Sequence, residues 1–178
     1  MSVNNQHFLV VNALGSDQIG VLEAFTKTSK QCGCNILESR LTTIGEECSL
    51  LLHLSGSWNT VAKLEAALPQ LAEQYGFTIH SKRTLPRKAS PALPYQVQVI
   101  AQDRAGILNE LALFFMQQGV FIDQMDCETY DAKNQTTMTS ISFVVNIPAK
   151  QHIASIRERF MVYCEDRNLD AVLEPFKS

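Results

Sequence analysis

One stretch of the chain occurs twice: Val10-Val-Asn-Ala-Leu-Gly-Ser-Asp-Gln-Ile-Gly-Val-Leu-Glu23 aligns without a gap with Gln96-Val-Gln-Val-Ile-Ala-Gln-Asp-Arg-Ala-Gly-Ile-Leu-Asn109. The spacing of 86 residues holds as far as Leu41 and Cys127. Seven aligned pairs are identical, namely Val11/Val97, Asp17/Asp103, Gly20/Gly106, Leu22/Leu108, Gln31/Gln117, Gly33/Gly119 and Ile36/Ile122. Because the identities fall on turns and on the starts and ends of helices, we predict two copies of one module.

The repeat divides the 178 residues into two small domains rather than one large one. We predict a first module over residues 1–83, a proline-rich basic linker over 84–94 and a second module over 95–178. Three prolines in the segment 84–94 indicate an extended connector. Because its basic residues lie in this extended stretch, we interpret them as part of a solvated linker rather than as a site of direct contact with nucleic acid.

The composition is that of an ordinary globular protein, with 46% hydrophobic and 19% charged residues. No apolar run reaches the roughly 18 residues needed to cross a bilayer, and the first residues lack a basic segment followed by an apolar one. We therefore expect a cytoplasmic protein without a membrane partner. The net charge of −3 argues against direct DNA binding, which normally requires a basic patch.

The cysteines and histidines do not form a recognisable catalytic or metal motif. Five cysteines, an odd number lying mostly in apolar patterns, indicate reduced thiols rather than disulfides. Cys32 and Cys34 offer two soft ligands, but no second Cys or His pair stands at zinc-site spacing. Without a nucleophile elbow or P-loop as well, we predict no catalysis, no metal and no cofactor. A remote alternative is an enzyme on the same frame, with Arg104 in a phosphate cradle.

The order of apolar runs predicts the same fold for both copies. Buried strands at 8–14 and 95–101 each precede an amphipathic helix, with Ile19, Leu22, Phe25 and Cys32 as the apolar stripe of the first. A hairpin follows in each copy, at 35–44 with 47–54 and at 121–130 with 136–147. A second helix then begins near residue 57 in the first copy and near residue 153 in the second. A closing strand completes each copy, at 77–81 and at 169–174. The predicted class is α+β: two ferredoxin-like β-α-β-β-α-β modules in tandem, each an antiparallel four-stranded sheet with two helices on one face.

The turn between the first strand and the helix suits a carboxylate ligand. A Gly- and Asp-rich turn that opens a helix presents free backbone N–H groups and the positive end of the helix dipole. Gly20 and Gly106 let a ligand approach the backbone closely, and Asn35 could bind the ammonium or the carboxylate of an amino acid. The alternative is that Asp17 and Asp103 only cap their helices, with the glycines serving turn geometry alone.

The β-α-β-β-α-β unit with Asp-x-x-Gly-[Ile/Val]-Leu resembles the ACT domain, an amino-acid-sensing module, over nearly the whole chain. Within that family, five stretches are similar to the glycine cleavage system transcriptional repressors: Leu14-Gly-Ser-Asp-Gln-Ile-Gly20, Cys32-Gly-Cys-Asn-Ile36, Ile44-Gly-Glu-Glu47, Leu54-Ser-Gly-Ser-Trp-Asn59 and Lys82-Arg-Thr84. The resemblance implies a response to glycine and contact with a DNA-bound LysR-type activator, without direct DNA binding. It also implies that Asn35 and Ile36 line the ligand pocket.

We therefore predict a small-amino-acid site, with glycine as the expected effector. Its residues are Leu14, Gly15, Ser16, Asp17, Gln18, Ile19, Gly20, Asn35 and Ile36. A second ligand site would comprise Asp103, Arg104, Ala105, Gly106 and Ile122, although Phe121-Ile122 replaces Asn35-Ile36 there. We expect binding at a module interface, where sheets or strand edges pair within the chain or with another copy in a homodimer. The alternative function is a regulatory subunit of an amino-acid biosynthetic enzyme.

Overall fold

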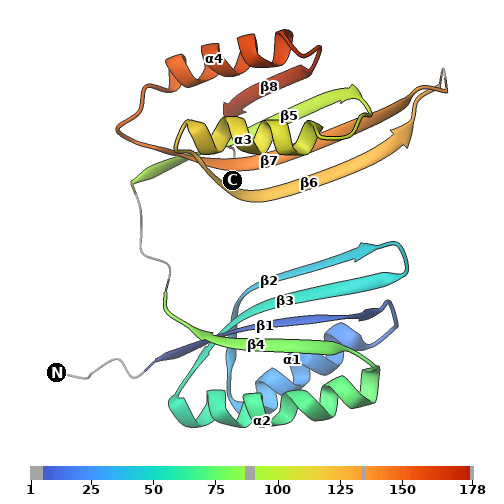
Figure 1. Cartoon of the computed structure of the whole chain (residues 1–178). Coiled ribbons are helices and arrows are strands. Elements are labelled where there is room, and N and C mark those ends of the chain that lie inside the picture. Colours follow the sequence, from blue (N-terminus) through green and yellow to red (C-terminus); the bar gives the residue numbers. More distant parts are fainter. Residues whose placement is uncertain (1–5, 87–90, 134, 177–178) are drawn as a thin grey trace. The chain divides into compact units, whose positions relative to one another are not determined.

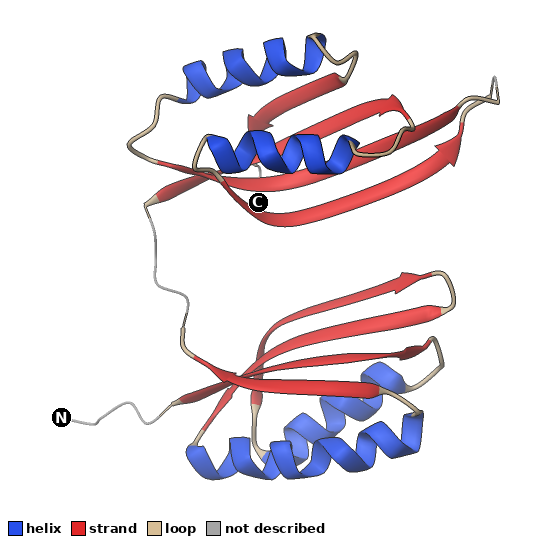
Figure 2. Cartoon of the chain, in the orientation of Figure 1, coloured by secondary structure: helices blue, strands red, loops and turns tan. Residues whose placement is uncertain are grey.

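The computed structural model describes residues 6–86, 91–133 and 135–176. The chain divides into two compact units, Met1–Lys88 and Ala89–Ser178, which we call the first and second modules and describe separately (Figure 1). Each is a four-stranded antiparallel sheet with two helices on one face, as the sequence predicts (Figure 2). No helix in the described part of the chain is long and apolar enough to cross a membrane.

The first module has the strand order β2-β3-β1-β4. Its elements are β1 (His7–Ser16), α1 (Val21–Cys32), β2 (Asn35–Ile44), β3 (Glu47–Gly56), α2 (Trp58–Tyr75) and β4 (Thr78–Thr84). Alternate residues of β1 and β3 point toward the helices, where Leu9, Leu50 and Leu54 are completely buried. Strand β2 lies at the edge of the sheet, so its outer edge makes no pairing within the described part of the module.

The second module repeats this order as β6-β7-β5-β8. Its elements are β5 (Ala92–Gln102), α3 (Ile107–Gln117), β6 (Phe121–Asp131), β7 (Thr137–Pro148), α4 (Ile153–Glu165) and β8 (Asp170–Pro175). Its core is richer in aromatic rings than that of the first module. The ring of Phe115 has its centroid 5.4 Å from Phe114, 5.7 Å from Phe143 and 5.3 Å from Phe160.

The two modules share backbone details as well as strand order. Gly20 and Gly106, at the N-caps of α1 and α3, have nearly the same conformation, with φ/ψ of 96°/−9° and 95°/−7°. The edge strands β2 and β6 are irregular at the same place, between Ile36 and Glu38 and between Ile122 and Gln124. The internal repeat therefore preserves local backbone geometry, which its residue pattern alone does not determine.

Two predictions about the elements are wrong in detail. In α1, Leu22 is 45% exposed and Ile19 precedes the helix, because the buried side is formed by Val21, Ala24, Phe25 and Ser29. Strands β4 and β5 extend to Thr84 and from Ala92, into the segment predicted as a linker. Pro94 is tolerated because it lies near the start of β5, before the pairing with β8 begins. Residues 87–90, which include the basic residues Arg87 and Lys88 of the predicted linker, lie outside the described residues.

All five cysteines are free. Burial raises the pKa of the Cys164 thiol to about 11, so this thiol stays protonated at neutral pH. In the described residues, no cluster of three or more His, Cys, Asp or Glu side chains is placed to hold a metal ion.

Candidate functional site

The loop from Gly15 to Gly20 leads from the end of β1 to an uncapped helix start. Among the described residues, no side-chain hydrogen bond caps α1, whose N-cap is Gly20, or α3, whose N-cap is Gly106. The reading in which Asp17 and Asp103 cap these helices is therefore wrong. The first-turn N–H groups of both helices lack a side-chain acceptor, which leaves them available to an anionic ligand.

Three contacts fix the loop of the first module. The Asp17 amide donates to the Glu46 carbonyl at 3.1 Å, and the Gln18 side chain donates to the Tyr75 carbonyl at 2.7 Å. A Cβ built on Gly15 would lie 2.8 Å from the ring of Phe77, so Gly15 serves close packing rather than ligand approach. The loop is thus tied to the β2–β3 turn and to the end of α2.

Other residues of this loop face solvent. Leu14, Ser16, Asp17, Ile19 and Gly20 are all exposed. A Cβ built on Gly20 would have no atom within 4 Å, so the space in front of the first turn of α1 is open. The loop therefore has a fixed backbone, and the space beside it is open to solvent and to a ligand.

Asn35 and Ile36 lie at the opposite end of the same sheet. The strand register places Asn35 beside Ser55 of β3, which in turn lies beside Phe8 near the start of β1. Strand β1 ends at Ser16, within the Gly15–Gly20 loop and eight residues beyond Phe8, or about 26 Å away at the rise of a β-strand. The structure of one first module therefore does not bring Asn35 and Ile36 together with the Gly15–Gly20 loop.

The second loop resembles the first but is more heavily engaged. The Asp103 amide donates to the Thr137 carbonyl at 2.9 Å, which matches the bond from Asp17 to Glu46. The hydroxyl of the buried Thr139 donates to the Asp103 carboxylate at 2.6 Å. Exposed Ala105 and Gly106 complete this turn, whereas Ile122 lies beside Val145 near the opposite end of the sheet.

Arg104 already has an acidic partner. Its two terminal nitrogens donate to the two carboxylate oxygens of Glu110 at 2.7 and 2.8 Å. The hydrogen bond from Arg104 lowers the pKa of Glu110, and the positive charges of Arg104 and Arg167 act in the same direction. A ligand at this loop would have to compete with Glu110 for the guanidinium.

The depressed pKa of Glu110 predicts a pH dependence of the second module's stability. A lowered folded-state pKa stabilises the module above the unfolded value of about 4.3, and this contribution is lost as the pH falls through the folded pKa. The Glu110→Gln variant should lack it, so the difference in melting temperature between wild type and variant should shrink as the pH falls below about 4.3. A difference in melting temperature that stays constant below this pH contradicts the assignment.

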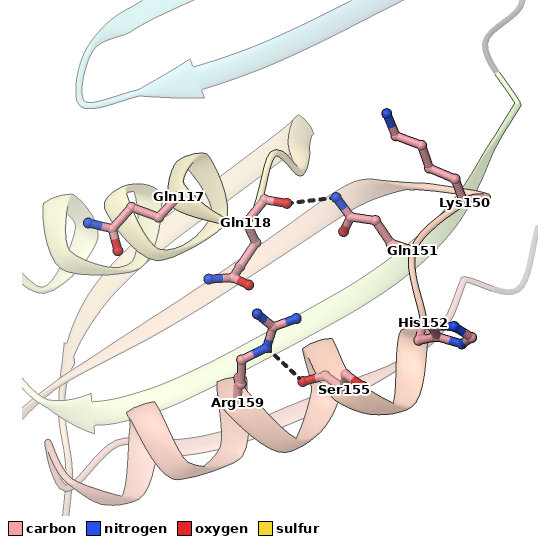
Figure 3. A pocket seen from close by; sticks show the side chains of 7 residues that line it. All are labelled: Gln117, Gln118, Lys150, Gln151, His152, Ser155 and Arg159. Atoms are coloured by element: carbon pink, nitrogen blue, oxygen red, sulfur yellow. Dashed lines mark hydrogen bonds between the residues drawn. The ribbon is translucent and has the colours of Figure 1, made fainter.

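A cavity that the sequence analysis did not identify lies in the second module, between the end of α3 and the start of α4 (Figure 3). Its volume is about 370 Å³. The available signal in the sequence was the local group Lys150, His152, Arg157 and Arg159, with Glu158 as its only carboxylate. This group of residues matches no known motif spacing. It also does not indicate that the end of α3 and the start of α4 enclose a cavity.

Comparison with known proteins identifies relatives over almost the full length. The ACT domain family model matches residues 7–82. The glycine cleavage system transcriptional repressor of Escherichia coli K12 is 33% identical over 171 residues, which cover 94% of this chain and 90% of that protein. The repressor of Shigella flexneri matches with the same identity and coverage.

Solved structures agree with these relatives. The crystal structure of a candidate glycine cleavage system transcriptional repressor has a TM-score of 0.75 and 26% identity, and covers 97% of this chain and 99% of its own. An unknown protein from Galdieria sulphuraria has a TM-score of 0.78 with the same coverage. At 22% identity, the latter shows a common fold alone.

Proposed function

Because this chain belongs to the family of glycine cleavage system transcriptional repressors, we propose that it regulates transcription by binding a DNA-bound LysR-type activator in response to glycine. The full-length match to the E. coli repressor carries the proposal. The chain is a regulator built from ACT domains and not an enzyme. The net charge of −3 supports contact with an activator rather than with DNA, and we expect a regulator with this role to act in the cytoplasm.

We assign the effector's carboxylate to the first turn of α1, beside the Gly15–Gly20 loop. Uncapped N–H groups and the positive end of the helix dipole attract an anion there. We prefer the first module because the hydrogen bonds of its loop go to backbone carbonyls, from the Gln18 side chain and the Asp17 amide. The Asp17 carboxylate makes no hydrogen bond among the described residues. In the second module, Thr139 and Glu110 already engage Asp103 and Arg104.

The remaining contacts come from Asn35 of a second copy. We propose that two first modules pair antiparallel through β2, where nine of ten residues are exposed along a free edge. Residues opposite one another in such a pair point to the same face. Registers with Glu38 opposite Glu38, or Arg40 opposite Arg40, bring like charges together. The register centred on Ser39 instead places each Glu38 opposite the partner's Arg40, on both sides of a two-fold axis.

This pairing would unite the two halves of the predicted site. Antiparallel pairing around Ser39 brings Asn35 of one copy to the end of the partner's β2, next to the β2–β3 turn that holds the partner's loop. The partner's Ser16 is then three strand spacings away, or about 14 Å, instead of the 26 Å within one module. Dimerisation would therefore be a condition of effector binding.

A charge exchange tests the pairing. Arg40→Glu alone, or Glu38→Arg alone, places like charges opposite one another at two symmetric positions and should weaken the dimer about tenfold. The double variant restores opposite charges and should recover the wild-type dimerisation constant. Sedimentation equilibrium measures all four proteins. A double variant as weak as the single ones rules out this register.

Isothermal titration calorimetry tests the effector. Glycine has five non-hydrogen atoms, which limits its binding free energy to about −7.5 kcal/mol, so dissociation constants from micromolar upward are expected. Titrations with glycine, serine, alanine and leucine should show selective binding of glycine with one site per chain. Tighter binding of leucine than of glycine contradicts the proposed effector.

A further inference from the structure

The cavity of the second module is lined by polar and basic side chains from two helix ends and the turn before α4 (Figure 3). The lining residues that concern ligand binding are Gln118, Lys150, Gln151, His152, Ser155 and Arg159. Its volume of about 370 Å³ is in the range of small-molecule sites. The predicted amino-acid loops do not contribute to this lining.

The charge of the cavity is opposite to that of the chain. Lys150 and Arg159 line it, and no Asp or Glu is among the described residues that do so. Neither cation forms an ion pair with a carboxylate in the described ranges, although Arg83 and Arg104 both do. In a chain of net charge −3, a pair of unneutralised cations in a concave site concentrates anions there.

Hydrogen bonds within the lining orient its polar groups. Nε of Arg159 donates to the Ser155 carbonyl at 3.1 Å, and the guanidinium points from α4 toward Gln118 and Gln151 (Figure 3). The side-chain nitrogen of Gln151 donates to the Gln118 carbonyl at 2.8 Å. The terminal nitrogens of Arg159 make no hydrogen bond in the described part of the chain, so they remain available as a two-pronged donor.

The corresponding junction in the first module is differently built. There Ser57 caps α2 by accepting a hydrogen bond from the Thr60 amide at 3.2 Å. The side chain of Thr60 fills the space between the helix ends, within 3.2 Å of a Cβ built on Gly33 and in contact with one built on Gly56. In the second module the N-cap is His152 and makes no side-chain cap bond. The basic cavity is therefore a property of the second module and not of the repeated fold.

We propose that this cavity binds a small molecule carrying a phosphate group. The planar fork of Arg159 and the ammonium of Lys150 suit a tetrahedral dianion. The amides of Gln118 and Gln151 can bond the rest of the molecule. Such a ligand would give the chain a second input, independent of the proposed amino-acid site.

NMR titration of the full chain with inorganic phosphate and adenosine monophosphate tests the proposal. Saturable shifts are expected at the Arg159 Nε–H and at the side-chain amide of Gln151. Arg159→Gln should weaken phosphate binding about tenfold, since it removes a charge-assisted hydrogen-bond pair, and Lys150→Gln about threefold. Both residues are exposed, so the variants should retain the melting temperature of the wild type.

Arg157→Gln is the matched control, because Arg157 is exposed on the same helix and does not line the cavity. It removes the same charge and should change phosphate affinity less than about twofold. An equal loss in Arg157→Gln and Arg159→Gln would show general charge attraction and overturn the site. Shifts without saturation up to about 50 mM phosphate, well above the millimolar range of weak specific sites, would do the same. Malonate binding as tightly as phosphate would overturn the phosphate class.

Discussion

Replacing Gly20 with leucine is expected to abolish glycine binding, with an affinity loss of more than about 100-fold, or 2.8 kcal/mol. Gly20 adopts a φ of 96°, and a Cβ at this position meets no protein atom within 4 Å. The new side chain would instead occupy the space in front of the first turn of α1, where we place the effector's carboxylate. It would block the ligand without disturbing a packed neighbour.

Gly106→Leu provides an unusually close control for this variant. Gly106 has the same backbone conformation, and its Cβ also faces open space. The conformational cost of a non-glycine residue with positive φ, about 1–2 kcal/mol, should therefore be similar in both modules. Calorimetry should show normal glycine binding by Gly106→Leu. If both variants lose binding equally, the effect is not specific to the first loop, and if Gly20→Leu still binds glycine, the site lies elsewhere.

Truncating Phe115 to alanine is expected to destabilise the second module by about 3–5 kcal/mol, the usual cost for a fully buried phenylalanine. Its ring contacts those of Phe114, Phe143 and Phe160, so three neighbours lose a packing partner. For a module of this size, the loss is a large share of the total stability of roughly 5–13 kcal/mol. Urea unfolding should show an early transition for the second module.

The unfolding of the first module should be unaffected by this change. Its buried residues form a core cluster of their own, separate from the cluster that contains Phe115. Leu113→Ala, on the same helix as Phe115 but 42% exposed, should cost less than about 1 kcal/mol. Hydrogen exchange resolves the two modules. Loss of protection in the first module to the same extent would show that the two cores unfold as one.

The fold could be predicted because its determinants are local. The glycines after each first helix, the Gly45-Glu46 turn and the alternation in Thr139, Ile141 and Phe143 each specify a turn or a face over a few residues. Their repetition at a fixed spacing then extended the prediction from one module to two. Strand ends were less predictable, because pairing extends a strand past its apolar run, as at Thr84 and Ala92.

The arrangement of the candidate site could not be predicted in the same way. Asn35 and Gly20 are only 15 residues apart, yet the sheet register places them at opposite ends. Sequence proximity carries no information about this separation, which depends on β2 running parallel to β1 with β3 between them. The exposure of Leu22 likewise depends on which side of α1 faces the sheet. The apolar positions in the sequence of this helix were too few to predict that side correctly.

The most direct test of the proposed function is the affinity of the purified chain for a LysR-type activator bound to its DNA site, with and without glycine. We predict that glycine changes the dissociation constant by about 5- to 150-fold, the usual range of allosteric coupling, and that Gly20→Leu abolishes the change. The chain alone should not bind the same DNA at physiological salt. An activator affinity unaffected by glycine, or capture of a biosynthetic enzyme in place of the activator, would contradict the account.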